Sequence, residues 1–238
     1  MTEQFVQYSL HDQVATIRID DGKRNALSPS VLRQIYEALD RAESDGAIVI
    51  LTGRESVFSA GFDLKVMKRG GMTALGMLRS GYALTARVLD YPYPVIVACN
   101  GHSLAMGVFL MLSADYVIGS HGDFKIAANE VAIGMTMPHV AAAMLCYRLK
   151  PADYQRAVTV SHFFNAESAL DAGFFDELVE PTDLINRANT LAAAFNLLDA
   201  RAHTVSKRRI RRSLIRKIRR SIPLDIFDAI LVIFRGTR

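Results

Sequence analysis

The sequence is poor in cysteine and has no apolar run long enough to cross a bilayer. It holds two cysteines in 238 residues, too few for a disulfide-stapled scaffold. Both Cys99 and Cys146 lie in apolar stretches, so we expect two reduced thiols in the core. The longest apolar runs, at 140–145 and 230–234, are too short for a membrane span. The N-terminus resembles neither a signal nor a transit peptide, and we expect a cytoplasmic protein.

The motifs of several enzyme classes are also missing. The six histidines show no metal-ligand spacing with one another or with the cysteines, so no metal site is predicted. There is no phosphate-binding P-loop, no dinucleotide fingerprint and no Ser-His-Asp pattern. These absences argue against a metalloenzyme, a nucleotide-dependent enzyme and a serine hydrolase.

Acidic residues are absent from one segment, 201–220, which carries ten Lys or Arg residues. The whole chain has a formal net charge of +4. Without this segment, 18 basic residues face 24 acidic ones, which is a net charge of −6. The positive charge therefore belongs to one segment, and the overall charge gives no argument for nucleic-acid binding.

Apolar runs alternate with helical periods along the first half of the chain, which indicates an α/β fold with a largely parallel sheet. The expected strands are 4–10, 14–19, 47–53, 95–99 and 116–118. The expected helices in this half are 28–42, 73–90 and 106–113. Later, the pattern predicts helices at 138–149, 151–159, 166–172, 182–199 and 204–221, with a short strand at 175–179. No repeat or low-complexity linker divides the chain.

Two strand-to-helix turns and one isolated carboxylate are candidates for chemistry. At 51–65 and at 100–110 an apolar strand gives way to small residues and then to a helix. The N–H groups at such helix starts suit a developing anion. Glu130 is the only charged residue between Lys125 and Arg148, and charged side chains are rarely buried without a partner or a task.

Five sequence blocks, in the correct order, resemble the enoyl-CoA hydratase/isomerase (crotonase) superfamily. They are Arg24-Asn-Ala-Leu-Ser28, Phe58-Ser-Ala-Gly-Phe-Asp-Leu-Lys65, Pro94-Val-Ile-Val-Ala-Cys-Asn-Gly101, Asn129-Glu-Val-Ala-Ile-Gly134 and the segment 166–179. The resemblance implies a ClpP/crotonase-like spiral of strand-strand-helix units, with C-terminal helices that form a homotrimer or a dimer of trimers. It predicts a core at 1–180 and a helical oligomerisation region at 181–238.

The resemblance also implies site residues. The thioester oxygen of an acyl-CoA substrate would lie between the main-chain N–H groups of Phe62 and Met106, with Glu130 as the acid/base. No cofactor is expected besides the coenzyme A of the substrate. The predicted substrate-binding residues are Arg24, Ala26, Ala60, Gly61, Asp63, Leu64, Lys65, Gly107, Phe109 and Asn129. Such donors stabilise an enolate, and burial would make Glu130 a better base.

One departure from the family pattern favours isomerisation over hydration. Family hydratases use two glutamates to hold a water molecule, and the first of these would fall at Phe109. A phenyl ring cannot activate water, whereas moving a double bond needs only one proton shuttle. We therefore favour a 3,2-enoyl-CoA isomerase. The alternatives are an enoyl-CoA hydratase of fatty-acid β-oxidation, a non-catalytic acyl-CoA- or RNA-binding protein, or an enzyme in which Asp63 supplies a further acid.

The basic segment predicts an amphipathic helix over 204–221, with Ile210, Leu214 and Ile218 on one face. The simplest interpretation is that this face packs on a neighbouring subunit while the cations stay in water. The cations could instead hold coenzyme A phosphates, or bind RNA or an anionic membrane surface. No aromatic residues alternate with the cations, so nucleic-acid binding is not expected.

Overall fold

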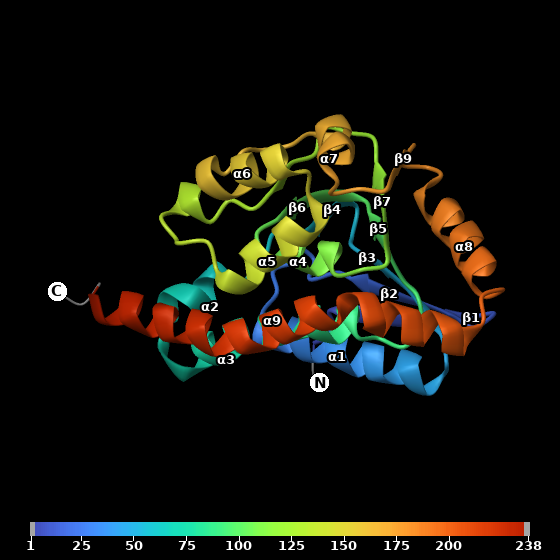
Figure 1. Ribbon diagram of the computed structural model, residues 1–238, viewed down its shortest axis with the longest axis horizontal. Helices are drawn as coiled ribbons and strands as arrows, with labels where there is room; N and C mark the ends of the chain where they lie inside the picture. The colour runs from blue at the N-terminus through green and yellow to red at the C-terminus, as the bar shows by residue number, and fades with distance from the viewer. Residues whose placement is uncertain (1–2, 236–238) are drawn as a thin grey trace.

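The computed structural model describes residues 3–235 and contains two β-sheets surrounded by helices (Figure 1). The strands are β1 Val6–His11, β2 Val14–Ile19, β3 Ile48–Thr52, β4 Ser56–Ser59, β5 Val95–Cys99, β6 Gly101–Leu104, β7 Tyr116–Ser120, β8 Ile126–Ala127 and β9 Glu177–Val179. The helices are α1 Pro29–Ser44, α2 Leu64–Arg69, α3 Gly71–Leu89, α4 Met106–Leu112, α5 His139–Arg148, α6 Pro151–Val160, α7 Ala166–Ala172, α8 Leu184–Phe195 and α9 Ala200–Arg235, with a 3-10 turn η1 at Val131–Ile133.

The larger sheet has the strand order β1-β2-β3-β5-β7-β9, and every pair except β1–β2 is parallel. All residues of β3 and β5 are buried, because helices cover both faces of the sheet. Helix α8 lies against one face, where Ala188 and Ala192 meet Ile50 and Ile96. The main core lies on the other face and includes α1, α3 and α4. The predicted α/β class and parallel sheet are confirmed.

The smaller sheet, β4-β6-β8, is parallel and was not expected from the sequence, which predicts only turns there. Each of its strands follows a strand of the larger sheet, and a helix follows in turn, so the strand-strand-helix unit repeats three times. The chain turns sharply between the sheets. A side chain at Gly101 would place its first carbon 2.0 Å from the Ser56 carbonyl oxygen, so only glycine fits. The repeat confirms the predicted spiral.

Helix α9 is longer than predicted, and its buried face includes two of the three predicted residues, Leu214 and Ile218. It runs unbroken through Pro223 and packs against α3 and α5 of its own chain (Figure 1). Ile210, expected on the buried face, is 67% exposed, whereas Lys207 and Arg211 are buried. Their partner is Asp115, whose carboxylate oxygens lie 2.6 Å from Lys207 Nζ and 3.0 Å from Arg211 Nη1. The prediction that all cations stay in water is therefore wrong.

The expectation of two buried thiols holds for only one of them. Cys99 ends the buried strand β5, and burial raises the pKa of its thiol to about 12. Cys146 is exposed. Helix α5 buries the face that carries Val140, Ala141 and Met144, and Cys146 falls outside that stripe.

Candidate active site

The amides of Phe62 and Met106 lie just beyond the ends of two paired strands, β4 and β6. Because these strands are parallel, with Ser59 opposite Ser103, their carboxyl ends meet at one edge of the small sheet. A carbon added at Gly61 would lie 3.2 Å from the Met106 nitrogen, so the two turns are in close contact. Within residues 3–235, neither the Phe62 nor the Met106 N–H donates a hydrogen bond to the protein. The geometry leaves two free donors side by side.

Strained and crowded backbone holds the second of these donors. Ala105 has φ 49° and ψ −124°, a backbone conformation that residues other than glycine rarely adopt. Its amide donates a hydrogen bond to the Ala127 carbonyl at 2.9 Å. The next glycine, Gly107, has no room for a side chain, since an added carbon would lie 2.6 Å from the Ser59 carbonyl oxygen. The α4 N-terminus is therefore pressed against β4, which fixes the Met106 amide.

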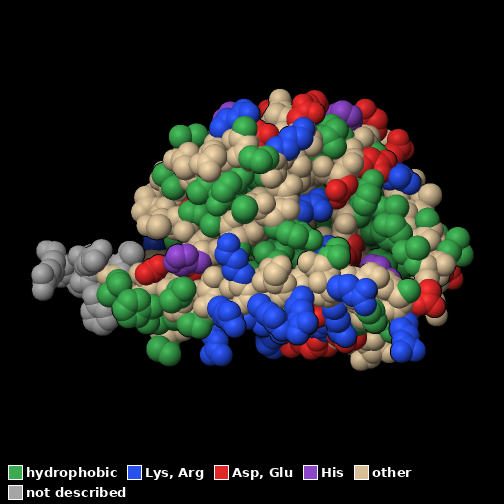
Figure 2. Space-filling view, in the orientation of Figure 1, with side chains coloured by type: hydrophobic (Ala, Val, Ile, Leu, Met, Phe, Trp, Pro, Cys, Tyr) green, Lys and Arg blue, Asp and Glu red, His purple; other side chains and the backbone are tan. Residues whose placement is uncertain are grey.

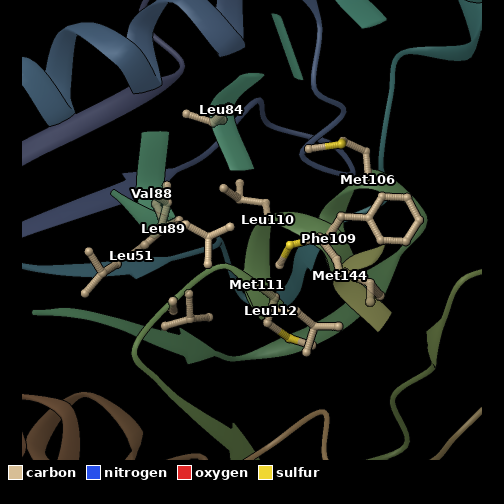
Figure 3. Packing of buried hydrophobic residues seen from close by; sticks show 14 of the residues in the cluster. Leu51, Leu84, Val88, Leu89, Met106, Phe109, Leu110, Met111, Leu112 and Met144 are labelled. Carbon is tan, nitrogen blue, oxygen red and sulfur yellow. The ribbon is translucent and has the colours of Figure 1, made fainter. Parts of the chain in front are cut away.

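The Phe62 side chain points away from its own amide and toward α3. A carbon added at Gly81 would lie 2.4 Å from the Phe62 ring, so glycine opens the space for it. The ring also meets Tyr82 edge to face, with the centroids 5.6 Å apart. Met106, by contrast, has its side chain fully buried among the core residues shown in Figure 3.

Glu130 enters the site from the third strand of the small sheet. Strand β8 pairs with β6 through Ser103 and Ile126, and Glu130 follows at the start of η1. The Glu130 side chain is buried, with the residue 4% exposed, and this burial raises the pKa of its carboxyl to about 7. The Oε2 atom of Glu130 and the Oδ1 atom of Asn129 are buried without a hydrogen-bond partner in the described part of the chain. Unpaired buried oxygens of this kind are available to a ligand.

These groups surround a small inner pocket of about 90 Å³. It is lined by Ala60, Phe62, Leu64, Met67, Tyr82, Ala105, Phe109, Asn129, Glu130, Ile133, Met135 and Pro138. Phe109 is 1% exposed and supplies hydrocarbon to the wall. Tyr82 was missed at the sequence level, because a tyrosine inside a helix carries no signal of its own. Burial, together with the charges of Asp225 and Glu130, raises its pKa, so the phenol stays protonated.

Four of the remaining predicted residues line a second, outer cleft of about 510 Å³. Arg24, Ala26, Asp63 and Lys65 are among its walls. The cleft is further lined by Glu3, Phe5, Asp21, Lys23, Ser28 and Val31, none of which the sequence singled out. Lys23, Arg24 and Lys65 could hold phosphate groups there. Gly61, Met106 and Gly107 supply backbone at the strand ends near the inner pocket.

Asp63 is not free to act as a second acid. Its carboxylate caps α2, accepting hydrogen bonds from the Lys65 amide at 2.8 Å and from the Val66 amide at 3.4 Å. It lines the outer cleft and is absent from the lining of the inner pocket. Asp63 therefore serves local structure in this arrangement.

One histidine–carboxylate group lies beside the inner pocket. Ligand atoms of His139, Asp225 and Asp228 are within 4.8 Å of one another, although the sequence spacing predicted no metal site. The Asp225 carboxylate is already occupied: it accepts from the His139 amide at 2.7 Å and from the Val140 amide at 3.0 Å. It therefore caps α5 from α9. The arrangement of His139, Asp225 and Asp228 is therefore explained by the capping of α5.

Three comparisons with known proteins place the chain. Residues 9–222 match the family model for enoyl-CoA hydratase/isomerase. The chain is 32% identical over 199 residues to a protein of Mycobacterium avium named "Probable enoyl-CoA hydratase echA17", covering 81% of this chain and 75% of that one.

Two solved structures extend the likeness. An enoyl-CoA hydratase/isomerase family protein from Pseudomonas syringae is 41% identical, with a TM-score of 0.92 over 93% of this chain and 96% of the other. An enoyl-CoA isomerase from Mycobacterium tuberculosis is 40% identical, with a TM-score of 0.88 over 92% and 96%. No helix in residues 3–235 has both the length and the apolar character needed to cross a membrane. By its sequence match and its fold, the chain belongs to the enoyl-CoA hydratase/isomerase family.

Proposed function

We propose that this protein isomerises 3-enoyl-CoA to 2-enoyl-CoA, with Glu130 as the single acid/base. The observation that carries the proposal is that, in the described part of the chain, Glu130 is the only carboxylate among the residues that line the inner pocket. Adding water to a double bond needs a group that positions the water and a group that takes its proton. At the place where family hydratases have their first glutamate, this pocket has the ring of Phe109.

Each group has a defined part in the proposed reaction. The Phe62 and Met106 amides donate to the thioester oxygen, which gains negative charge when a C2 proton leaves. Glu130 takes that proton, and the electrons of the C2–H bond form the dienolate. Protonation at C4 by the same carboxyl then leaves the double bond between C2 and C3 and returns Glu130 to its ionised state. No water and no redox partner enters this balance.

The raised pKa of Glu130 suits this role. A carboxyl with a pKa of about 7 is a stronger base than an exposed glutamate, and it still carries a proton long enough to deliver it. The apolar walls also limit the approach of water to the dienolate. We expect the rate to rise with pH through about 7, because only the ionised carboxylate starts the reaction.

The names of relatives point both ways. The 40% identical protein from Mycobacterium tuberculosis is titled an isomerase in one solved structure and a probable hydratase in another. The 32% identical protein from Mycobacterium avium is named a probable hydratase, and hydratase names are the more frequent among the relatives. Hydration is therefore the second candidate. The hydrocarbon at Phe109 argues against it.

The decisive experiment supplies the purified protein with 3-enoyl-CoA and, separately, with 2-enoyl-CoA. We expect a shifted double bond from the first and no 3-hydroxyacyl-CoA from the second. Glu130→Gln should abolish isomerisation, while the matched control Glu37→Gln, on the exposed face of α1, should not. Efficient hydration of 2-enoyl-CoA would overturn the proposal, as would full activity of Glu130→Gln. Binding of acyl-CoA without exchange of the C2 proton in deuterated water would instead indicate a non-catalytic binding protein.

A further inference from the structure

A row of arginines runs along the outward face of α9. Arg209, Arg212, Arg216 and Arg220 are all exposed, and their spacing of three, four and four residues puts them on one side of the helix. At a rise of 1.5 Å per residue, the row is about 17 Å long. Figure 2 shows basic side chains gathered along the helix that Figure 1 identifies as α9.

The row carries charge that the protein does not neutralise. In residues 3–235, none of its four guanidinium groups lies within 4.0 Å of a carboxylate oxygen. The neighbouring Arg208 and Arg219 both pair with Asp90, at 3.0 Å each. The buried cations of the same helix, by contrast, are matched by Asp115. The pairing with Asp115 therefore explains why Lys207 and Arg211 carry charge, whereas no ion pair within the described residues explains the charge of the arginine row.

Exposed apolar side chains follow the row toward the end of α9. Phe227 lies seven residues beyond Arg220, on the same side of the helix, and is 58% exposed. Leu224, one turn earlier, is 54% exposed. No aromatic residue occurs among the cations between 204 and 226, and Phe227 lies beyond the last of them, so the row has no succession of rings on which bases could stack. Cations in a row with exposed apolar groups at one end match an anionic bilayer, which attracts the first and accepts the second.

We propose that this face of α9, defined by Arg209, Arg212, Arg216, Arg220 and Phe227, docks the protein on an anionic lipid surface. The contact is peripheral: guanidinium groups meet lipid phosphates and Phe227 enters the headgroup boundary. It is independent of the proposed isomerase chemistry, because none of these residues lines the inner pocket or the outer cleft.

The test is co-sedimentation of the full chain with lipid vesicles. Vesicles of phosphatidylglycerol and phosphatidylcholine in equal parts should retain the protein at low salt and release it at high salt. Vesicles of phosphatidylcholine alone should not bind it. Replacing the four arginines by glutamine should weaken binding about 600-fold, at about fivefold for each charge near the surface. Phe227→Ser should weaken it about tenfold.

A matched control removes the same charge elsewhere. The variant R33Q/R79Q/K150Q/R156Q changes four exposed cations outside α9 and should bind anionic vesicles almost as the parent chain does.

Three results would overturn the proposal. The first is equal binding of the α9 variant and the control. The second is binding to a single-stranded RNA oligomer with none to anionic vesicles. The third is a change in oligomer size for the α9 variant, which would assign this face to contacts between copies of the chain.

Discussion

Replacing Glu130 by glutamine should stabilise the protein at alkaline pH while it removes activity. In the folded state the carboxyl has a pKa of about 7, because burial disfavours its charge, against an ordinary glutamate value of 4.5. A difference of about 2.5 between folded and unfolded pKa values corresponds to about 3 kcal/mol. The folded protein therefore carries a penalty of this size whenever Glu130 is ionised.

The sign of the pH dependence follows from proton binding. Below about pH 4.5, both states hold the proton and Glu130 contributes nothing. Between about 4.5 and 7, unfolding releases the proton, so stability falls as the pH rises. Above about 7, both states are ionised and the full penalty applies. Glutamine cannot ionise, so the variant avoids the whole of this loss.

The assay is chemical unfolding of the parent chain and Glu130→Gln between pH 4.5 and 8.5, at one protein concentration. The variant's advantage in free energy of unfolding should grow by about 3 kcal/mol across this range, or roughly 6–12 °C in melting temperature. Glu37→Gln should show no such growth. A difference between variant and parent that is independent of pH would refute the argument, because it would show that Glu130 is not desolvated.

Three further predictions test other parts of the structure. Ala105→Gly should relieve the positive φ and raise the free energy of unfolding by about 1 kcal/mol; a lower urea midpoint would contradict this. Tyr82→Phe should lower kcat about tenfold while the chain stays folded, because it deletes the hydroxyl of a buried pocket residue; unchanged kcat would assign Tyr82 a packing role only. Lys207→Met should cost about 3 kcal/mol in urea unfolding, because it breaks the buried pair with Asp115; Lys217→Met, on the exposed face, should cost almost nothing.

The sequence predicts the larger sheet well and the smaller one not at all. Strands β3 and β5 are continuous apolar runs, and burial on both faces makes that pattern visible. Strands β4 and β6 have four residues each and hold serine, or serine with glycine and histidine, so they resemble turns in sequence. Strand β8 has only two residues, which is too short for a recognisable pattern. All three form strands because the chain leaves β3, β5 and β7 in turn and crosses to the smaller sheet, where the three segments pair. Only the folded structure reveals this pairing.

The five sequence blocks predicted most residues of the candidate site. The site residues that the sequence did not predict, such as Tyr82, lie outside these blocks. Tyr82 reaches the pocket because α3 packs beside Phe62, a contact that depends on Gly81 having no side chain. The buried face of α9 was predicted only in part, for a related reason: Leu214 and Ile218 are buried as expected, whereas the burial of Lys207 was not foreseen. Lys207 is tolerated inside because Asp115, 92 residues earlier, lies within 2.6 Å, and no local pattern reports that distance. The roles assigned to the site residues and the expected trimer remain predictions.

The cap that Asp225 places on α5 ties the far half of α9 to the pocket wall. Cutting the chain before Asp225 would leave the first amides of α5 without their acceptor, directly beside Pro138, which lines the inner pocket. A shortened protein would then lose catalytic geometry even though every proposed reacting group is still present. A C-terminal deletion that impairs turnover should therefore not be taken as proof that the deleted residues touch the substrate.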